Sequence, residues 1–297
     1  MRQGKDEAER MIEVGKSPLV KIVAGAFGVI ALVLGTVGVL SAQTIGQRLE
    51  DSRRSFGGGE GFYDPSGRAF TFCRAAYNQV RREPMGQGWR TDYPDADRNL
   101  MLRLSQLTTT PIRTTRQGRP DHLIVELTDE EIFECPFVFM SDVGTMRMNL
   151  EEVQNLRRYL NQGGFLWVDD FWGSFAWEMW VQEISKVLPP GEHPIEDVPA
   201  DHMLFSALYN VLDGVPQIPS IQFWRRGQGT SEQGFDSSVP HLRSIKDDKG
   251  RIVVLLSHNT DIADGWEREG EDDAFFFAYS PKAYALGINI IVYAMTH

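Results

Sequence analysis

The chain has 297 residues, of which 42% are hydrophobic and 24% are charged. These fractions are typical of a globular protein and exclude a disordered, collagen-like or multi-span membrane chain. The formal net charge is −11, so the sequence lacks the basic surface of proteins that bind nucleic acid through phosphates, and we expect no nucleic-acid partner. Two cysteines are too few for a disulfide framework or a cysteine-rich zinc site.

The N-terminal part of the sequence predicts a membrane anchor. Residues 1–17 are polar, whereas residues 22–40 contain no charged side chain. As a helix, this apolar run spans roughly 28 Å, which is about the thickness of the hydrocarbon core of a bilayer. The run is also longer than the apolar part of a cleaved signal peptide. We therefore predict an uncleaved transmembrane helix over 18–42, followed by a flexible tether over 43–65.

The sequence gives weaker signals for the orientation of this helix in the membrane and for its partners. Basic residues are nearly balanced on its two sides, but a short N-terminus before a long globular part favours a periplasmic or extracellular location for that part. Small residues recur along the helix at intervals of three or four, and they let two helices approach closely. We expect self-association, or pairing with another membrane protein, through the stripe formed by Ala24, Gly28, Ala31, Gly35 and Gly38.

From residue 66 onward, the hydrophobic pattern predicts alternating strands and helices. The predicted strands are 69–73, 122–127, 136–141, 165–168 and 251–257. The predicted helices are 97–107, 150–162, 174–187 and 281–295. This order is typical of one α/β domain, here 66–297, with a mostly parallel sheet flanked by helices on both faces. The stretch 189–245 is richer in proline and polar residues, and we interpret it as an insertion.

Several of the helix ends have sequence signals. Asn149 and Glu152 form a capping-box-like pair at the start of one helix, and Gly163-Gly164 ends that helix. Ser280 followed by Pro281 predicts the start of the last helix. Asp95 or Asp97 is expected to cap the helix 97–107; alternatively, the two side chains belong to a recognition loop that binds a ligand.

Three segments resemble the motifs of a known family. They are 93–97 (YPDAD), 163–170 (GGFLWVDD) and 286–293 (LGINIIVY), and with their flanking residues they span roughly 68–297. In order and spacing they are similar to the DUF4159 family, whose function is unknown. The resemblance implies a class I glutamine-amidotransferase-like fold, which is a relative of flavodoxin-like sheets.

The catalytic relatives of that fold carry a cysteine nucleophile on the sharp turn after a central strand, with a histidine and an acid. Here the strand 165–168 is followed by Asp169 and Asp170 instead. Cys73 lies in the first predicted strand and Cys135 precedes the third. In a parallel sheet these positions fall near opposite strand ends, so we expect neither a catalytic thiol nor a disulfide between them.

Polar residues follow three of the predicted strands, and ligands of open α/β sheets bind at the carboxyl ends of strands. The ligand-binding candidates at this edge are Asp142, Asp170, Asn259 and Asp261, and the catalytic candidates are Asp169, Asp170 and His258. Such a set could bind a divalent cation or a polyol. The alternative is that these side chains only cap turns and helices. Motifs such as HExxH and the EF-hand loop are absent, so we assign no metal ligands and no cofactor.

The sequence therefore favours a membrane-anchored, non-catalytic module that binds a ligand or another protein. The alternative is a hydrolase-like enzyme that uses the acidic edge of the sheet with a metal or a carbohydrate-type substrate. The missing nucleophile favours the first hypothesis.

Overall fold

The computed structural model describes residues 69–211, 213–227 and 229–297, which all belong to one compact unit, Phe56–His297. The predicted polar N-terminus (1–17), membrane helix (18–42) and tether (43–65) lie outside the described residues, as does the small-residue stripe from Ala24 to Gly38.

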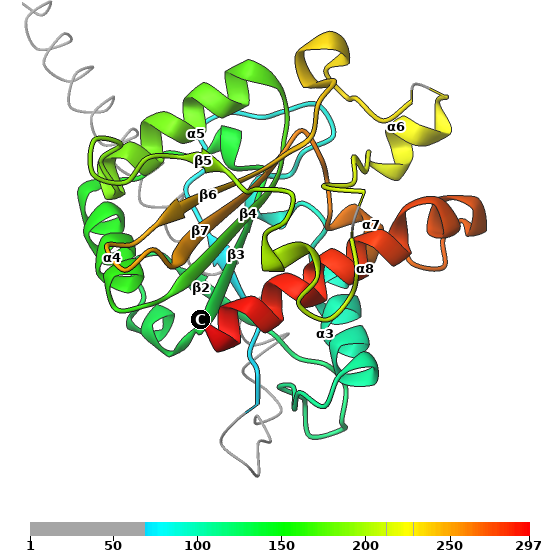
Figure 1. Ribbon diagram of the computed structural model, residues 1–297, viewed down its shortest axis with the longest axis horizontal. Helices are drawn as coiled ribbons and strands as arrows, with labels where there is room; N and C mark the ends of the chain where they lie inside the picture. Colours follow the sequence, from blue (N-terminus) through cyan, green and yellow to red (C-terminus); the bar gives the residue numbers. More distant parts are fainter. Residues whose placement is uncertain (1–68, 212, 228) are drawn as a thin grey trace, which may run out of the picture. The chain divides into compact units, whose positions relative to one another are not determined.

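A seven-stranded, mostly parallel sheet forms the centre of the domain, in the order β2-β1-β3-β4-β7-β6-β5 (Figure 1). The parallel strands are β1 (Cys73–Ala76), β2 (Leu123–Glu126), β3 (Phe137–Ser141), β4 (Phe165–Phe171) and β7 (Ile252–His258). The antiparallel strand β6 (His241–Lys246) pairs with β7 and with β5 (Glu196–Asp197). The α/β class and the mostly parallel sheet are thus confirmed.

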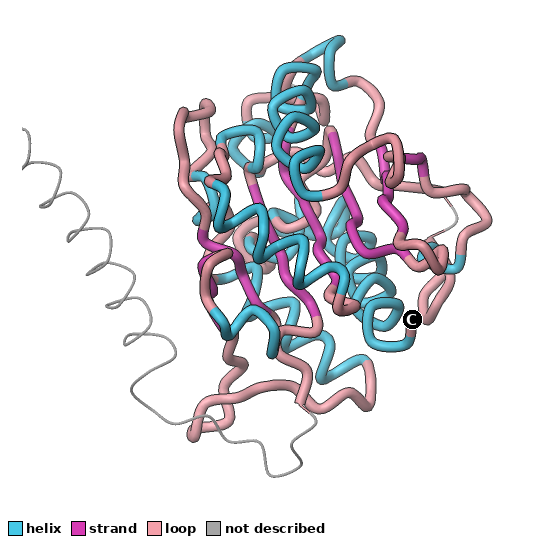
Figure 2. The backbone as a smooth tube through the Cα atoms, turned by 90° about the vertical axis from the view of Figure 1, so that its left-hand side faces the viewer, coloured by secondary structure: helices cyan, strands magenta, loops and turns pink. Residues whose placement is uncertain are grey.

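Helices cover both faces of the sheet, as Figure 2 shows. One layer contains α4 (Leu150–Asn161) and α5 (Gly173–Val187), and the other contains α3 (Asp95–Leu107), α7 (Asp264–Glu267) and α8 (Asp273–Thr296). The remaining short helices are η1 (Gly88–Arg90), η2 (Glu130–Glu134), η3 (Val143–Thr145), η4 (Met203–Phe205), α6 (Ile221–Arg225) and η5 (Gly234–Ser237).

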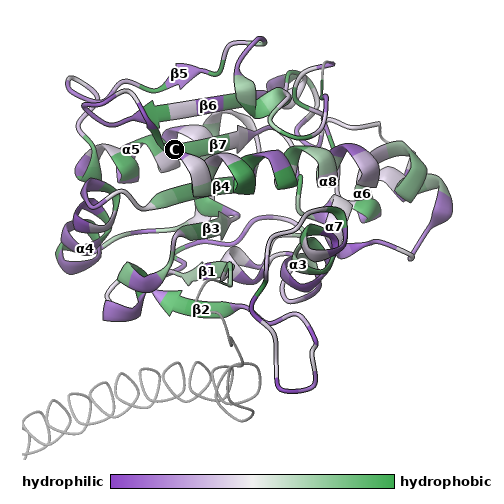
Figure 3. Ribbon diagram, turned by 60° about the horizontal axis from the view of Figure 1, so that its bottom comes forward, coloured by the Kyte–Doolittle hydropathy of each residue, from purple (hydrophilic) through white to green (hydrophobic). Residues whose placement is uncertain are grey.

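The alternation of side chains along β3 explains the two layers. Phe137 and Phe139 belong to the core beneath α3 and α8, whereas Val138 and Met140 belong to the core beneath α4 and α5. Neighbouring residues of a strand point to opposite faces, so a continuous apolar run fits a strand that is buried on both sides. Figure 3 shows these apolar strands at the centre and polar residues on the outer surface of α4.

The predicted capping box of α4 is confirmed. Asn149 Oδ1 accepts hydrogen bonds from the backbone N–H groups of Glu151 and Glu152, at 2.8 and 3.0 Å, and Glu152 Oε2 accepts from Asn149 N at 2.6 Å. These bonds satisfy donors that have no partner inside the helix. After the helix, Gly163 has a φ of +96°, which favours glycine.

The predicted start of the last helix at Ser280 is wrong. α8 begins at Asp273, and Asp272 Oδ1 accepts hydrogen bonds from Ala274 N and Phe275 N at its start. Pro281 lies inside the helix, where its ring costs one backbone hydrogen bond. Burial against the sheet outweighs that loss, since Leu286, Ile288 and Ile290 on the same helix are fully buried.

The length and composition of α8 would also suit a membrane span, and among the described residues it is the only helix of that kind. However, 56% of its apolar stretch is buried inside the domain. This burial is typical of the core helix of a globular domain.

Cys73 and Cys135 form a disulfide, so the prediction that they stay apart is wrong. The error came from a strand boundary. β1 begins at Cys73 instead of ending there, and Cys73 lies beside Val138 of the adjacent strand β3. Cys135 precedes β3 by two residues, so both cysteines lie at the amino ends of neighbouring parallel strands, with their Cα atoms 6.0 Å apart.

The stretch 189–245, which was interpreted as an insertion, contributes to the sheet itself. It contains β5 and most of β6, and β6 runs beside β7 over its whole length. The segment His241–Lys246 has only six residues, and its polar and apolar side chains do not alternate regularly, which makes such a strand hard to recognise in a sequence.

Candidate functional site

A cavity of about 70 Å³ lies at the carboxyl ends of β3, β4 and β7. Its lining is strongly acidic, with a single basic residue, Arg268. We call this cavity the acidic pocket. Its acidic side chains are Glu83, Asp92, Asp142, Asp170, Glu232, Asp261, Asp264 and Glu267.

The acidic pocket collects residues from segments far apart in the sequence. Asp142 directly follows β3, Asp170 is the penultimate residue of β4, and Asp261 follows β7. Asp92 comes from the loop before α3, while Asp264 and Glu267 begin and end α7. The strand ends therefore supply one side of the pocket, and the helix layer of α3 and α7 supplies the other.

The backbone around the acidic pocket is unusual. Among the described residues, five that are not glycine have a positive φ, and four of them line the pocket: Met85, Asp92, Asp142 and Asp170. The φ values of the three aspartates are 63°, 52° and 53°. Side chains with a Cβ adopt this conformation at a cost, and such residues concentrate at functional sites.

Two groups of three carboxylates converge in the pocket, and in each group the potential ligand atoms lie within 4.8 Å of one another. We call Asp92, Asp170 and Asp261 the first triad, and Asp92, Asp264 and Glu267 the second triad. Asp92 belongs to both. This spacing suits oxygen ligands around one divalent cation in each triad.

The carboxylates of the first triad are buried but poorly satisfied. Asp92, Asp170 and Asp261 are only 5%, 9% and 2% exposed. Asp92 Oδ2 accepts from Ser141 Oγ at a long 3.4 Å, Asp170 Oδ1 from Trp172 Nε1 at 2.9 Å, and Asp261 Oδ1 from Asp264 N at 2.8 Å. The second oxygen of each receives no hydrogen bond from the described part of the chain, and no basic side chain there forms an ion pair with any of the three.

The second triad already contacts a positive charge. Arg268 Nε lies 2.7 Å from Glu267 Oε2 and 3.6 Å from Asp264 Oδ1. Asp264 Oδ2 also accepts a hydrogen bond from Ile221 N at 2.8 Å. The two triads therefore differ in electrostatic balance, although they share Asp92.

Burial raises the pKa of all five carboxyls in the two triads, because the charged form loses its hydration. The pKa values of Asp92, Asp170 and Asp261 lie well above the usual range for aspartate, and the negative charges of their neighbours raise them further. Burial raises the pKa of Asp264 to about 8, with a further contribution from Glu267. A bound cation would favour the charged forms and reverse these shifts.

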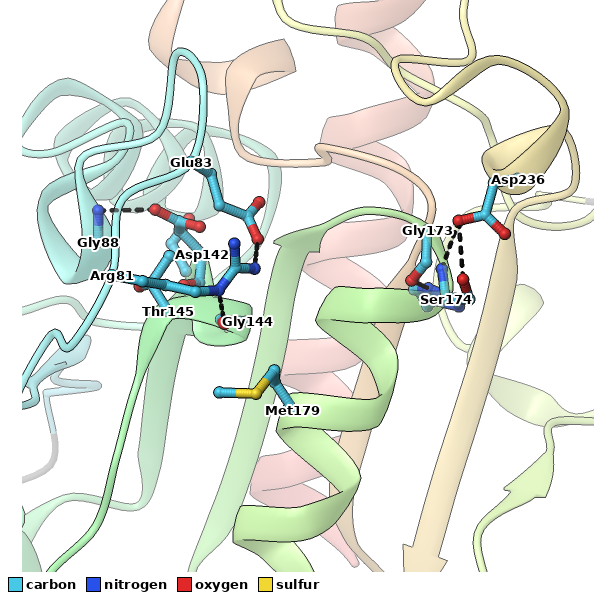
Figure 4. Close-up of polar contacts among 12 residues, drawn as sticks. Arg81, Glu83, Gly88, Asp142, Gly144, Thr145, Gly173, Ser174, Met179 and Asp236 are labelled. Atoms are coloured by element: carbon cyan, nitrogen blue, oxygen red, sulfur yellow. Dashed lines mark hydrogen bonds and ion pairs between the residues drawn. The ribbon is translucent and has the colours of Figure 1, made fainter.

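Asp142 is held by the loop that closes one side of the acidic pocket. Its Oδ2 accepts a hydrogen bond from Gly88 N at 2.7 Å (Figure 4). A Cβ at Gly86 would lie 2.5 Å from the same oxygen, so the loop passes too close for a larger residue. Nearby, Arg81 donates to Gly144 O at 2.7 Å and pairs with Glu83. Burial raises the pKa of Asp142 to about 6.

The other candidates from the ends of β4 and β7 do not line the acidic pocket. His258 Nε2 donates to Gly173 O and its Nδ1 accepts from Arg243 Nη1, both at 3.1 Å. Asn259 Oδ1 accepts from Gly173 N at 2.9 Å. Asp169 Oδ2 accepts from Ala263 N at 2.9 Å, and its Oδ1 is buried without a hydrogen bond from the described residues.

Asp95 and Asp97 also lie outside the acidic pocket, and neither caps α3, because Pro94 occupies the cap position. The predicted cap is therefore wrong. Asp97 is fully buried and pairs with Arg74, whose Nε lies 3.0 Å from both carboxylate oxygens. Asp95 is exposed and lies 3.6 Å from Arg98.

Three residues of the triads were not among the candidates from the sequence: Asp92, Asp264 and Glu267. Asp92 directly precedes the YPDAD segment, and Glu267 begins an acidic run that reads as a solvated loop. Asp264 follows Asp261 by three residues, which is the one local signal that the two act together. The sequence does not indicate that α7 lies beside the ends of β4 and β7.

Comparison with known families gives one match. The family described as a domain of unknown function (DUF4159) matches residues 71–295, which include all residues of both triads. No curated protein matches the chain.

Proposed function

We propose that this chain, which belongs to the DUF4159 family, is a membrane-anchored, non-catalytic ligand-binding module whose α/β domain lies outside the cytoplasm and binds a divalent cation in the acidic pocket. The observation that carries the proposal is the first triad: three carboxylates, each more than nine-tenths buried, that converge on one point with an unused oxygen on each.

The physical argument is one of charge compensation. Burying a carboxylate away from water is costly unless a cation or several hydrogen bonds replace the hydration. No basic side chain of the described residues forms an ion pair with the first triad, although the charge of Arg74 acts on Asp92 from a distance, and each carboxylate receives one hydrogen bond. Carboxylate oxygens are the preferred ligands of Ca²⁺, Mg²⁺ and Mn²⁺. A divalent cation supplies the compensation that the chain does not.

The uncharged run at 22–40 supports the membrane anchor. The Cys73–Cys135 disulfide supports the location outside the cytoplasm, because disulfides form and persist in oxidising compartments. A reporter that is active only outside the cytoplasm, fused after His297, is expected to be active, and the mature chain is expected to retain residues 1–42. Activity of a cytoplasmic reporter would contradict the orientation.

We further propose that the domain has the flavodoxin-like, class I glutamine-amidotransferase-like fold that its motifs imply. Numbered among themselves, the five parallel strands follow the order 2-1-3-4-5, which is the flavodoxin-like order. In sheets of that order the ligand lies at the carboxyl ends of the strands, and the acidic pocket has the same position.

Calorimetric titration of the purified full-length chain tests cation binding. After treatment with a chelator, the protein is titrated separately with Ca²⁺, Mg²⁺ and Mn²⁺, and we expect saturable binding of at least one of them. Asp261→Asn keeps the hydrogen-bond acceptor for Asp264 N but loses the charge, so it is expected to weaken binding at least tenfold. Asp95→Asn, at an exposed position outside the pocket, is the matched control. Absence of binding for all three ions would refute the proposal.

One observation favours a second candidate function, a metal-dependent hydrolase. Asp142 lines the acidic pocket but belongs to neither triad, and Gly88 N holds its carboxylate in place. It could accept a proton from a water molecule on the cation. A panel of phosphate and carboxylic esters, assayed with Mn²⁺, separates the two functions. Turnover that Asp142→Asn abolishes, while Mn²⁺ binding is retained, would favour the hydrolase; no turnover favours the binding module.

A further inference from the structure

We infer that the acidic pocket takes a second divalent cation, bound by Asp92, Asp264 and Glu267 and bridged to the first cation by the carboxylate of Asp92. This inference rests on the proposed cation-binding function, and it adds that the centre holds two ions and that Arg268 competes with one of them.

The shared residue provides the geometry. A carboxylate has two oxygens, and in two-cation sites the ions lie about 3.5–4 Å apart, which one bridging carboxylate can span. Asp92 is 5% exposed and belongs to both triads. The only hydrogen bond that it receives from the described residues is the long one from Ser141 Oγ. Its Oδ1 therefore receives no hydrogen bond from the described residues, and its Oδ2 receives only this weak one, so the side chain can offer ligand atoms to both triads.

The charges of the pocket favour two ions over one. The five carboxylates of the two triads carry five negative charges when ionised, and Arg268 supplies one positive charge. With Arg268 in place, one divalent cation leaves two negative charges without compensation, whereas a second cation that displaces Arg268 leaves only one. An uncompensated buried charge is costly, so the pocket gains more from the second ion than an exposed acidic patch would.

Arg268 occupies the position where the second cation would bind. Its Nε lies 2.7 Å from Glu267 Oε2 and 3.6 Å from Asp264 Oδ1, yet this buried nitrogen makes no well-aligned hydrogen bond with the described residues. Its Nη1 already lies 3.2 Å from Glu271 Oε2, and the side chain is 31% exposed. The guanidinium can therefore swing toward Glu271 and leave its place to an ion.

This competition sets the order of binding. The first triad has no basic partner and fills first, whereas the second fills at a higher concentration because the ion must displace Arg268. Removing the competing charge by Arg268→Gln is expected to tighten the second site about tenfold and to change the first site less.

Mn²⁺ titration of the full-length chain, followed by calorimetry and by electron paramagnetic resonance, tests the inference. The wild type is expected to bind two Mn²⁺ ions, and the second addition is expected to give the spin-coupled signal of a bridged pair. Glu267→Gln is expected to keep only the first ion. Asp273→Asn, at an exposed position outside the pocket, is the control and is expected to behave as the wild type.

Each outcome decides between the two proposals. A single Mn²⁺ in the wild type and in Arg268→Gln would overturn the second site and leave the proposed function intact. No Mn²⁺ in any variant would overturn the second site, and absence of Ca²⁺ and Mg²⁺ binding as well would overturn both proposals. Two ions without spin coupling would overturn the bridge through Asp92. If Glu267→Gln fails to fold, as judged by circular dichroism, the Arg268→Gln variant still tests the inference. An unchanged Mn²⁺ affinity of the second site in Arg268→Gln would contradict the competition between Arg268 and the second cation.

Discussion

Asp97 and the acidic pocket are two places where this domain buries negative charge, and they are compensated in opposite ways. Asp97 lies in the core beside Arg74, and the Nη1 of Arg74 donates to Trp89 O at 3.1 Å and to Thr91 O at 2.9 Å. In the acidic pocket, the five carboxylates of the two triads have one arginine among them, Arg268, which forms ion pairs only with the second triad.

The comparison separates a structural charge from one that requires an external partner. Both regions lose the hydration of their carboxylates, but the chain itself completes the surroundings of Asp97. In the pocket, the described part of the chain provides no ion pair for Asp92, Asp170 and Asp261. The backbone of Asp92 and of Asp170 is also held at positive φ. A buried charge is thus evidence of function only where its own chain leaves it uncompensated.

The largest effect is expected where compensation is removed from the core. Asp97→Asn leaves Arg74 charged and buried without its partner, which is expected to cost about 3–5 kcal/mol in the free energy of unfolding. Urea denaturation of the purified chain measures this loss. A loss below about 1 kcal/mol would show that the ion pair contributes little and would remove the contrast with the pocket.

A buried group that remains neutral gives the second test. Burial lowers the pKa of His258 to about 4, and the groups that face it are Gly173 O, Arg243, His241 and Asp236. Between pH 4 and 6.5 the unfolded chain binds the additional proton, so the stability due to this group is present above pH 6.5 and is lost as the pH falls through about 4. The loss is at most about 3 kcal/mol.

His258→Gln isolates that contribution, because the other titrating groups are unchanged. Urea denaturation at pH 7, 5.5 and 4 is expected to show a smaller loss of stability in the variant than in the wild type. Equal pH dependence in both proteins would mean that His258 does not account for the acid sensitivity.

Removing a charge from the pocket is expected to act in the opposite direction to Asp97→Asn. In a chelator-treated sample, Asp92→Asn relieves repulsion within both triads and is expected to stabilise the domain by about 1–2 kcal/mol. With excess Mn²⁺ the wild type is expected to gain thermal stability and the variant is not. Destabilisation by Asp92→Asn without cation would indicate that its carboxylate is already compensated.

The smallest effect is expected when both partners of the core pair are replaced together. Arg74→Met combined with Asp97→Leu exchanges the ion pair for apolar side chains of similar size, and such exchanges are often nearly neutral. We expect an unfolding free energy within about 1 kcal/mol of the wild type. The double variant could instead lose as much free energy of unfolding as Asp97→Asn alone. The pair would then stabilise the fold by more than neutralising its two charges, for example through the hydrogen bonds from Arg74 to Trp89 O and Thr91 O.

Local patterns predicted the elements of this fold better than their contacts. The apolar run before Ser141 and the capping box at Asn149 are properties of adjacent residues, and both were predicted from the sequence. The disulfide was not, because a strand boundary placed a few residues too early moved Cys73 from one end of the sheet to the other. In a parallel sheet, such an error changes which residues can meet.

The candidate site was predictable on its sheet side only. The rule for strand ends selected Asp142, Asp170 and Asp261, which all line the acidic pocket. It could not separate Asp170 from Asp169, because adjacent strand residues point in opposite directions and either could have faced the pocket. Asp92 reaches the pocket through the packing of the loop before α3, and this long-range contact has no local pattern in the sequence.

The far edge of the sheet has a consequence for how copies of this domain meet. The outermost strand, β5, has only two residues, Glu196 and Asp197, which pair with Lys246 and Arg243 on β6. An incoming strand would find a short template for hydrogen bonds and would have to desolvate these charges. Crowding of many copies on one surface is therefore not expected to cause aggregation through this edge.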